Sequence, residues 1–273
     1  MKKLLGLTIG LFFSIILLQA QNDTIYFMKN GVIVNQQSIL PTDVDSAIFY
    51  QPVIVLDTST SFTDSRDSQV YQLVTIGSQV WMAENLKYLP SVVDSTTGSE
   101  ISGFETELYY YVYGYNDTDV AEAKATANYI TYGVLYNWNA AMAGEVSSNE
   151  NPSGVQGVCP TGWHLPSTAE WTQLADFLGG APVAGGKLKE AGITHWANPN
   201  TGATNETGFT ALPGGYRNSL GEYKFMATFG IWWTTSIANE TGADVAKISY
   251  QSSYLEAPPY NFNAGLSVRC VRD

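Results

Sequence analysis

The chain has 273 residues, of which 25 are acidic and 13 basic, and its formal net charge is −12. Phosphate backbones and anionic membrane surfaces should repel a protein this acidic when it has no cluster of Lys or Arg, so nucleic-acid binding is excluded as a primary role. An acidic surface favours solubility outside the cell and can hold calcium weakly. The sequence indicates no other cofactor.

The first twenty residues have the pattern of a secretory signal peptide. Two lysines are followed by an apolar run over residues 4–18 and by the small residue Ala20, before a polar segment. This order is typical of a cleaved signal, and an apolar run of about 15 residues is shorter than the roughly 20 that a membrane span needs. We therefore expect residues 1–20 to be removed and the protein to be periplasmic, cell-surface or secreted, with no transmembrane segment after cleavage. The alternative is an uncleaved N-terminal anchor.

Residues 21–51 predict a small β module. Two apolar runs flank Asn30-Gly31, which is the strongest short signal for a β-hairpin because both residues tolerate positive φ, and a further strand is expected over residues 46–50. Residues 52–66 are polar and mostly small, which is typical of a linker. The remaining residues, 67–273, are expected to form one large domain.

The large domain is expected to contain two early strand regions. Apolar runs at residues 70–76 and 79–82 flank a Gly-Ser turn and predict a hairpin. Residues 108–115 read Leu-Tyr-Tyr-Tyr-Val-Tyr-Gly-Tyr and also predict a strand. Because side chains alternate along a strand, every second tyrosine would share one face, including Tyr109, Tyr111 and Tyr113.

Helices are predicted at two places. Residues 120–128 are rich in alanine, the best helix former. After Pro166, Ser167 and Glu170 have the spacing of a capping box, in which each side chain bonds the backbone amide of the other residue, and a Gly pair at residues 179–180 supplies the stop. Few helices among many short strands and long loops indicate an α+β domain.

The only two cysteines, Cys159 and Cys270, are 111 positions apart. Export places them in an oxidising environment, which favours a structural disulfide. Closing so long a loop stabilises the fold by up to about 4.7 kcal/mol in the chain-entropy model. The alternatives are two buried thiols or a redox pair, but there is no Cys-x-x-Cys and no basic cluster beside Cys159.

Seven phrases follow one another through the large domain. They are Ile-Gly-Ser-Gln-Val-Trp-Met-Ala-Glu-Asn-Leu (76–86), Tyr-Gly-Val-Leu-Tyr-Asn-Trp-Asn-Ala-Ala-Met (132–142), Cys-Pro-Thr-Gly-Trp-His-Leu-Pro-Ser (159–167), Ala-Gly-Gly-Lys-Leu-Lys (184–189), Gly-Phe-Thr-Ala-Leu-Pro-Gly-Gly-Tyr-Arg (208–217), Trp-Thr-Thr-Ser (233–236) and Ser-Val-Arg-Cys-Val-Arg-Asp (267–273). Together they resemble the Fibrobacter succinogenes major paralogous domain, a secreted domain of Fibrobacter and Bacteroidota. That family has no established reaction, so the resemblance implies export without implying an activity.

Two phrases, His-Leu-Pro-Ser-x-x-Glu-Trp and Ser-Val-Arg-Cys, are also distantly similar to those of the formylglycine-generating enzymes. Those enzymes have a variant of the C-type lectin-like fold, so the resemblance implies that fold here. Their activity does not follow, because they bind copper through a reactive cysteine pair, whereas Cys159 and Cys270 fit structural phrases. The Glu-Pro-Asn, Gln-Pro-Asp and Trp-Asn-Asp phrases of calcium-dependent C-type lectins do not occur either.

The sequence indicates no catalytic or metal-binding residue. His164 and His195 are 31 positions apart and lack the additional ligands of a zinc site. There is no Gly-x-Ser-x-Gly elbow, phosphate loop or dinucleotide fingerprint. None of the acids lies in a motif that marks a glycoside-cleaving pair.

Aromatic side chains give the main indication of function. Tyr and Trp offer flat faces that stack on sugar rings, and their polar tips tolerate water. The candidate ligand-binding residues are Tyr109, Tyr111, Tyr113, Trp232 and Tyr254, and the alternative for the tryptophan and the tyrosine strand is the core. We expect an exported, non-catalytic recognition module that binds a glycan or a cell-surface protein. The alternatives are an extracellular hydrolase or modifying enzyme, and a structural subunit of a surface assembly.

Overall fold

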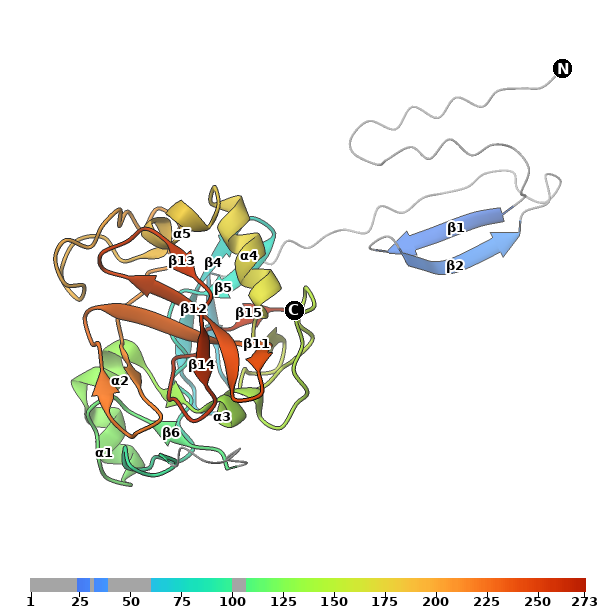
Figure 1. The fold of residues 1–273 in the computed structure, drawn as a ribbon. Coiled ribbons are helices and arrows are strands. Elements are labelled where there is room, and N and C mark those ends of the chain that lie inside the picture. The colour runs from blue at the N-terminus through green and yellow to red at the C-terminus, as the bar shows by residue number, and fades with distance from the viewer. Residues whose placement is uncertain (1–23, 30–31, 39–59, 100–106) are drawn as a thin grey trace, which may run out of the picture. The chain divides into compact units, whose positions relative to one another are not determined.

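The chain divides into two units, Met1–Asp57 and Thr58–Asp273. The computed structural model describes residues 24–29, 32–38, 60–99 and 107–273 (Figure 1). In the first unit, β1 (Thr24–Lys29) and β2 (Val32–Ser38) pair antiparallel, as the Asn-Gly pattern predicts. The predicted signal peptide, the strand at 46–50 and residues 52–59 of the predicted linker lie outside the described residues.

A five-stranded antiparallel sheet organises the second unit. Its strands lie in the order β3-β4-β5-β15-β8, and their bounds are Ser61–Thr63 for β3, Val70–Ile76 for β4, Gln79–Met82 for β5, Val271–Arg272 for β15 and Trp163–His164 for β8. The predicted hairpin is confirmed as β4 and β5. Val271 pairs with Trp81 on one side and His164 on the other, so β15 lies between two strands that come much earlier in the chain.

Strand β3 falls inside the segment that its composition assigns to a linker. Phe62 of this strand packs on Trp163, with ring centroids 5.2 Å apart. Asp64 is buried and forms an ion pair of 2.7 Å with Arg66. Residues 61–66 therefore belong to the large domain. A short edge strand of small polar residues has the same composition as a linker, and only its long-range pairing with β4 distinguishes the two.

A second sheet has β12 at its centre. This strand pairs with β11 along one edge and with β13 and β14 along the other. The bounds are Phe229–Asn239 for β11, Gly242–Ser249 for β12, Leu255–Glu256 for β13 and Pro259–Asn261 for β14. Two small pairs complete the strands: β6 (Tyr110–Tyr111) with β7 (Leu135–Tyr136), and β9 (Tyr216–Arg217) with β10 (Tyr223–Lys224).

The helices of the described residues are short. They are α1 (Val120–Ala125), α2 (Ala127–Tyr132), α3 (Trp138–Met142), α4 (Thr168–Phe177) and α5 (Ala181–Leu188). The helix predicted over residues 120–128 is split at Thr126, whose side chain caps α2. The predicted capping box is present at the start of α4. In Figure 1, α4 and α5 lie at one end of the domain and α1 and α2 at the other.

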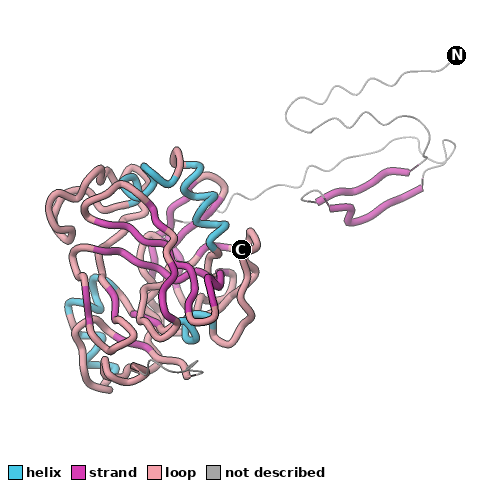
Figure 2. Tube along the Cα trace, in the orientation of Figure 1, coloured by secondary structure: helices cyan, strands magenta, loops and turns pink. Residues whose placement is uncertain are grey.

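Loops make up much of the trace in Figure 2, and they join few helices and many short antiparallel strands. The mixed α and β class predicted from the sequence is therefore confirmed. Among the residues that the structure describes, no helix has the length and apolar character that crossing a membrane requires.

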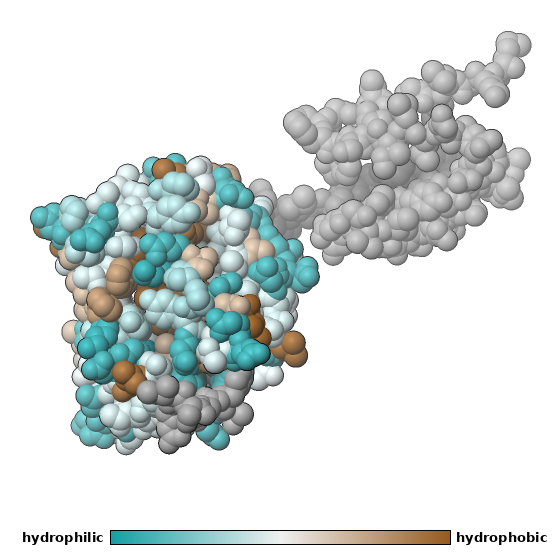
Figure 3. Space-filling model, viewed as in Figure 1, coloured by the Kyte–Doolittle hydropathy of each residue, from teal (hydrophilic) through white to brown (hydrophobic). Residues whose placement is uncertain are grey.

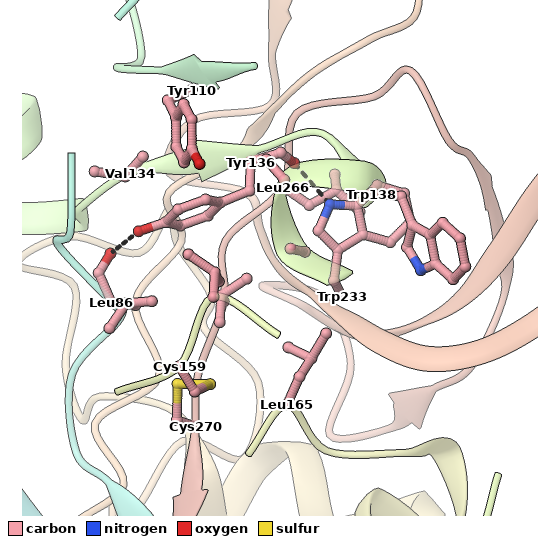
Figure 4. Close-up of a cluster of buried hydrophobic side chains, with 14 of the residues drawn as sticks. Leu86, Tyr110, Val134, Tyr136, Trp138, Cys159, Leu165, Trp233, Leu266 and Cys270 are labelled. Carbon is pink, nitrogen blue, oxygen red and sulfur yellow. Dashed lines mark hydrogen bonds between the residues drawn. A yellow bond between two sulfur atoms is a disulfide. The ribbon is translucent and has the colours of Figure 1, made fainter. Parts of the chain in front are cut away.

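Two hydrophobic clusters form the core. Figure 4 shows part of the larger one, where the Tyr136 hydroxyl lies near the Leu86 carbonyl and the Trp233 indole donates to the carbonyl of Tyr136 at 2.7 Å. The predicted disulfide between Cys159 and Cys270 is confirmed, and it is part of this cluster. It links the loop before β8 to the chain just before β15.

Candidate functional site

The strand predicted over residues 108–115 is wrong in extent. Only Tyr110–Tyr111 form a strand, β6, and the chain turns at Gly114, where φ is 76°. Without an extended backbone the side chains do not alternate, so the predicted common face for every second tyrosine does not form. A glycine within the run was the signal for this turn.

Tyr111 is buried within the domain. Its ring lies 4.5 Å from the guanidinium carbon of Arg217, and its hydroxyl donates to the Thr97 carbonyl at 2.9 Å. Tyr109 and Tyr113 are partly exposed. Tyr109 lies 6.4 Å from the Tyr111 ring, and Tyr113 packs on Tyr223 at 5.0 Å. The three tyrosines therefore do not form one solvent-exposed surface.

Trp232 is also buried. Its indole stacks near Trp171 at 5.8 Å and donates to Asn85 Oδ1 at 2.8 Å. Trp233 is equally inaccessible. Both tryptophans therefore pack in the core, which is the alternative that the sequence left open, because their strand is covered on both faces.

Tyr254 is the candidate residue that borders a cleft. Its side chain is 45% exposed, and it lies at the rim of a cleft of about 200 Å³ between α4, β11, β12 and β13. The floor combines Trp171 and Ala175 of α4 with Val245, Ala246 and Leu255 from the sheet. On the face of the domain shown in Figure 3, strongly apolar residues are scattered among polar ones and form no broad patch.

Helix α4 gives the cleft a polar wall. Thr168, Thr172 and Asp176 all line it, and their four-residue spacing places them along one stripe of the helix. Thr168 Oγ1 lies 3.2 Å from Thr234 Oγ1, which adds a further hydroxyl from β11. The cleft is therefore apolar at its floor and rich in hydroxyl and carboxylate oxygens at its side.

Trp171, whose side chain contributes to the floor of the cleft, has a buried donor without a partner. The indole nitrogen of Trp171 is buried and forms no hydrogen bond with any of the described residues. Leaving a buried N–H without an acceptor costs about 1–3 kcal/mol. The Trp171 ring packs in the core, with its centroid 4.7 Å from that of Trp81.

Acidic groups surround the cleft. Asp176 and Glu256 line it, and Glu256 Oε2 forms an ion pair of 2.9 Å with Lys247. Asp244 lies next to the hydroxyl wall, since its backbone carbonyl accepts from Thr234 Oγ1 at 2.7 Å. Burial raises the pKa of Asp244, and a hydrogen bond with Thr168 partly offsets that rise. The local charge is therefore negative near neutral pH.

Lys189 holds the loop that carries Tyr254 in place. The ammonium of this fully buried residue donates to the carbonyls of Thr201, Ser249 and Ser252 at 2.8, 3.0 and 3.0 Å. Burial lowers the pKa of Lys189 to about 8. Gly186 of α5 adds a bond from its amide to the Ser253 carbonyl at 3.1 Å. The rim of the cleft is thus tied to α5.

The sequence analysis did not predict Thr168, Asp176 or Glu256 as residues of a binding site. The spacing of Thr168, Thr172 and Asp176 along a predicted helix was a usable signal for a polar stripe. Glu256 had no such signal, because it reaches the cleft through the pairing of β13 with β12. Among the residues that the structure describes, no group of three or more His, Cys, Asp or Glu could hold a metal ion.

Comparisons with known proteins identify the family. Residues 74–272 match the model of the Fibrobacter succinogenes major domain. No curated protein and no solved structure matches the chain. The match spans most of the 273 residues and includes the phrases that hold the disulfide, the capping box of α4 and β15. The chain therefore belongs to the Fibrobacter succinogenes major domain family.

Proposed function

We propose that the protein is an exported, non-catalytic recognition domain on a C-type lectin-like scaffold, and that the cleft beside Tyr254 binds one ring of a glycan. The observation behind the proposal is the meeting of the half-exposed Tyr254 with an apolar floor and a stripe of hydroxyl and carboxylate oxygens in one small cleft. A ligand with an apolar ring face and several hydroxyl groups uses both features.

A sugar ring matches this chemistry. Its C–H face packs on an aromatic side chain, and its hydroxyl and ring oxygens both donate and accept hydrogen bonds. The cleft of about 200 Å³ lies below the roughly 300–1,000 Å³ that drug-sized ligands occupy. The cleft therefore suits a single sugar ring or one short side branch of a glycan, while the rest of the glycan stays outside the cleft.

The negative charge of the cleft determines which classes of glycan it can bind. Asp176 has no cation paired with it in the structure of the described residues, and the whole chain carries a net charge of −12. Sulfated, sialylated and uronic-acid glycans are therefore repelled, whereas neutral sugars and sugars with a free amine are accepted. Carboxylates also accept hydrogen bonds from adjacent sugar hydroxyls more strongly than neutral oxygens do.

A glycan array tests the proposal directly. We would screen residues 21–273 against neutral, amino and anionic glycans and mucins, with calcium and again with a chelator. Binding restricted to neutral or amino glycans is expected. Tyr254→Ala and Asp176→Asn should each weaken binding at least about tenfold, a loss of about 1.4 kcal/mol. Glu240→Gln, on an exposed loop, is the charge-matched control and should bind normally.

Three results would count against the proposal. An array without hits, or hits that Tyr254→Ala leaves unchanged, would remove the cleft as a glycan site. Release of reducing sugar from a bound glycan would favour the extracellular hydrolase instead. Loss of binding in the chelator would show that calcium, and not the cleft alone, holds the ligand.

A further inference from the structure

Four Asn-x-Thr tripeptides occur in the chain, beginning at Asn22, Asn116, Asn205 and Asn239. This pattern marks an acceptor asparagine for N-linked glycosylation in a secreted protein, provided that the middle residue is not proline. The first tripeptide begins outside the described residues. The other three differ in their hydrogen bonds, and the difference distinguishes one of them.

Asn239 lies at the tip of the β11–β12 hairpin. It pairs with Gly242, and Glu240 and Thr241 form the two-residue turn between the strands. All three residues of the tripeptide are exposed. The Thr241 carbonyl accepts from the Phe262 amide at 3.1 Å, so the backbone of the turn is anchored while its side chains remain accessible.

The side chain of Asn239 is oriented by its own threonine. Asn239 Oδ1 accepts from the Thr241 amide at 2.9 Å and from the Thr241 hydroxyl at 3.1 Å. A backbone amide only donates, so the side-chain atom that faces it must be the oxygen. The Nδ2 nitrogen therefore lies on the side away from the turn, and it has no hydrogen-bond partner among the residues that the structure describes.

Asn205 is a matched comparison, because it begins the same tripeptide, Asn-Glu-Thr. Its Nδ2 donates to Thr210 Oγ1 at 3.1 Å, and its Oδ1 accepts from the Thr210 amide at 2.9 Å. The hydroxyl of Thr207 donates to the Lys187 carbonyl at 3.3 Å. At this site the asparagine nitrogen is occupied, and the threonine hydroxyl is bonded elsewhere.

Asn116 lacks the threonine contact. It is exposed, and its Oδ1 accepts from the Ser95 amide at 3.3 Å. The Thr118 amide donates to Asp117 at 2.7 Å, and no hydrogen bond joins Thr118 to Asn116 in the described part of the chain. Of the three tripeptides that the structure describes, Asn239 alone combines a free, exposed nitrogen with a threonine hydroxyl on its oxygen.

This arrangement favours transfer of a sugar to Asn239. An amide nitrogen is a poor nucleophile, because its lone pair is delocalised onto the carbonyl oxygen. Loss of an Nδ2 proton places negative charge on Oδ1, and a hydroxyl that already donates to Oδ1 stabilises that charge. The nitrogen can then attack the anomeric carbon of an activated sugar.

We propose that Asn239 is an N-glycosylation site whose donor is a sugar carried on a lipid diphosphate. The bond from Nδ2 to the anomeric carbon forms as the bond from that carbon to the diphosphate oxygen breaks. The diphosphate leaves with the electron pair, and the Nδ2 proton passes to a base of the transferase. This inference rests on the proposed export of the protein and not on its proposed glycan binding.

The two Asn-Glu-Thr tripeptides test the geometry within one molecule. Folded protein would be incubated with a purified oligosaccharyltransferase and a lipid-diphosphate-linked oligosaccharide, and the occupancy of each site measured by peptide mass spectrometry. Occupancy at Asn239 should exceed that at Asn205 at least about tenfold, since one donor to a developing charge changes a rate by roughly 10²–10³. Short peptides that carry either tripeptide lack the tertiary contacts and should be modified about equally. Equal occupancy in the folded protein, or more at Asn205, overturns the proposal.

Two substitutions of Thr241 separate the hydroxyl from the shape of the turn. Thr241→Ser keeps the hydroxyl and should keep Asn239 modified. Thr241→Val has the shape of threonine without the hydroxyl, and it should lower the occupancy at least about tenfold. Both variants should unfold at the same urea concentration as the unmodified protein, because residue 241 is exposed. Undiminished modification of Thr241→Val also overturns the proposal.

Protein isolated from its own cells shows whether the site is used. Its peptide that contains Asn239 should carry a sugar, and Asn239→Gln should remove the added mass. An unmodified Asn239 in this protein overturns the inference and leaves the proposed cleft unaffected. A glycan array without hits, obtained with protein that is modified at Asn239, overturns the proposed binding and leaves the modification site.

Discussion

Three buried cations in the domain are stabilised by hydrogen bonds to carbonyl oxygens and by aromatic rings. Lys189 donates to three carbonyls, Arg217 to those of Ser95, Thr97 and Asn263, and Arg269 to those of Phe209 and of the Asn85 side chain. Arg269 also lies 4.1 Å over the Phe209 ring, and burial lowers its pKa to about 9. Such residues fix loops in place, because removing one leaves several buried carbonyls unpaired.

His164 gives the domain a pH-dependent stability. Its two ring nitrogens lie 2.7 Å from Glu170 and 2.7 Å from Asp273. Burial lowers its pKa, but the two carboxylates raise it by more, so the pKa lies above 6.5. The stabilisation is therefore complete below about pH 6.5 and is lost as pH rises through the raised pKa.

His164→Gln removes this contribution. At pH 6 it should lower the free energy of unfolding by about 1.5–3 kcal/mol, the range for a hydrogen bond to a charged group. The difference from the unmodified protein should shrink as the pH rises towards 8.5. Urea unfolding across that range measures both quantities. A difference that stays constant with pH would mean that the histidine is neutral throughout.

At the scale of elements, the features that were predicted correctly are mostly those whose signals lie within a few residues. The hairpin of β4 and β5 and the cap of α4 depend on residues a few positions apart, and both were predicted correctly. The tyrosine run predicts one long strand, although Gly114 within it is a local signal for the turn found there. Strand β3 has the composition of a linker, and only its pairing with β4 identifies it as a strand. The same applies to the site: Tyr254 was a candidate from its residue type, but only tertiary packing reveals the cleft beside it.

Helix α5 positions the rim of the cleft through its glycines. A Cβ on Gly185 would lie 2.6 Å from the Tyr254 carbonyl and 2.9 Å from that of Ser253. In an unconstrained helix, Gly→Ala stabilises by about 1 kcal/mol. Here Gly185→Ala should instead destabilise the fold and weaken the proposed glycan binding, since the rim must move.

Two measurements check this prediction, namely urea unfolding and the array signal. Lys187→Ala, on the more exposed side of α5, should change the free energy of unfolding by no more than about 0.5 kcal/mol. If Gly185→Ala proves more stable than the unmodified protein, the contact between α5 and the rim is looser than the structure indicates.

At the scale of the whole molecule, the disulfide joins segments 111 positions apart and lies within the larger hydrophobic cluster. Replacing Cys159 and Cys270 together by Ala should lower the free energy of unfolding by about 2–5 kcal/mol. Denaturant unfolding of this variant beside the unmodified protein measures the loss. An equal loss on adding a reductant to the unmodified protein would confirm its origin, whereas a loss under about 1 kcal/mol would show that packing alone holds the two segments together.

The position of β15 has a consequence for biogenesis. Because this strand fills the gap between β5 and β8, the five-stranded sheet cannot close until residues 271–272 have been made. Until then both neighbours present unpaired edges, which invite association with other chains. A growing chain that does not yet include residues 271–272 therefore lacks a closed five-stranded sheet.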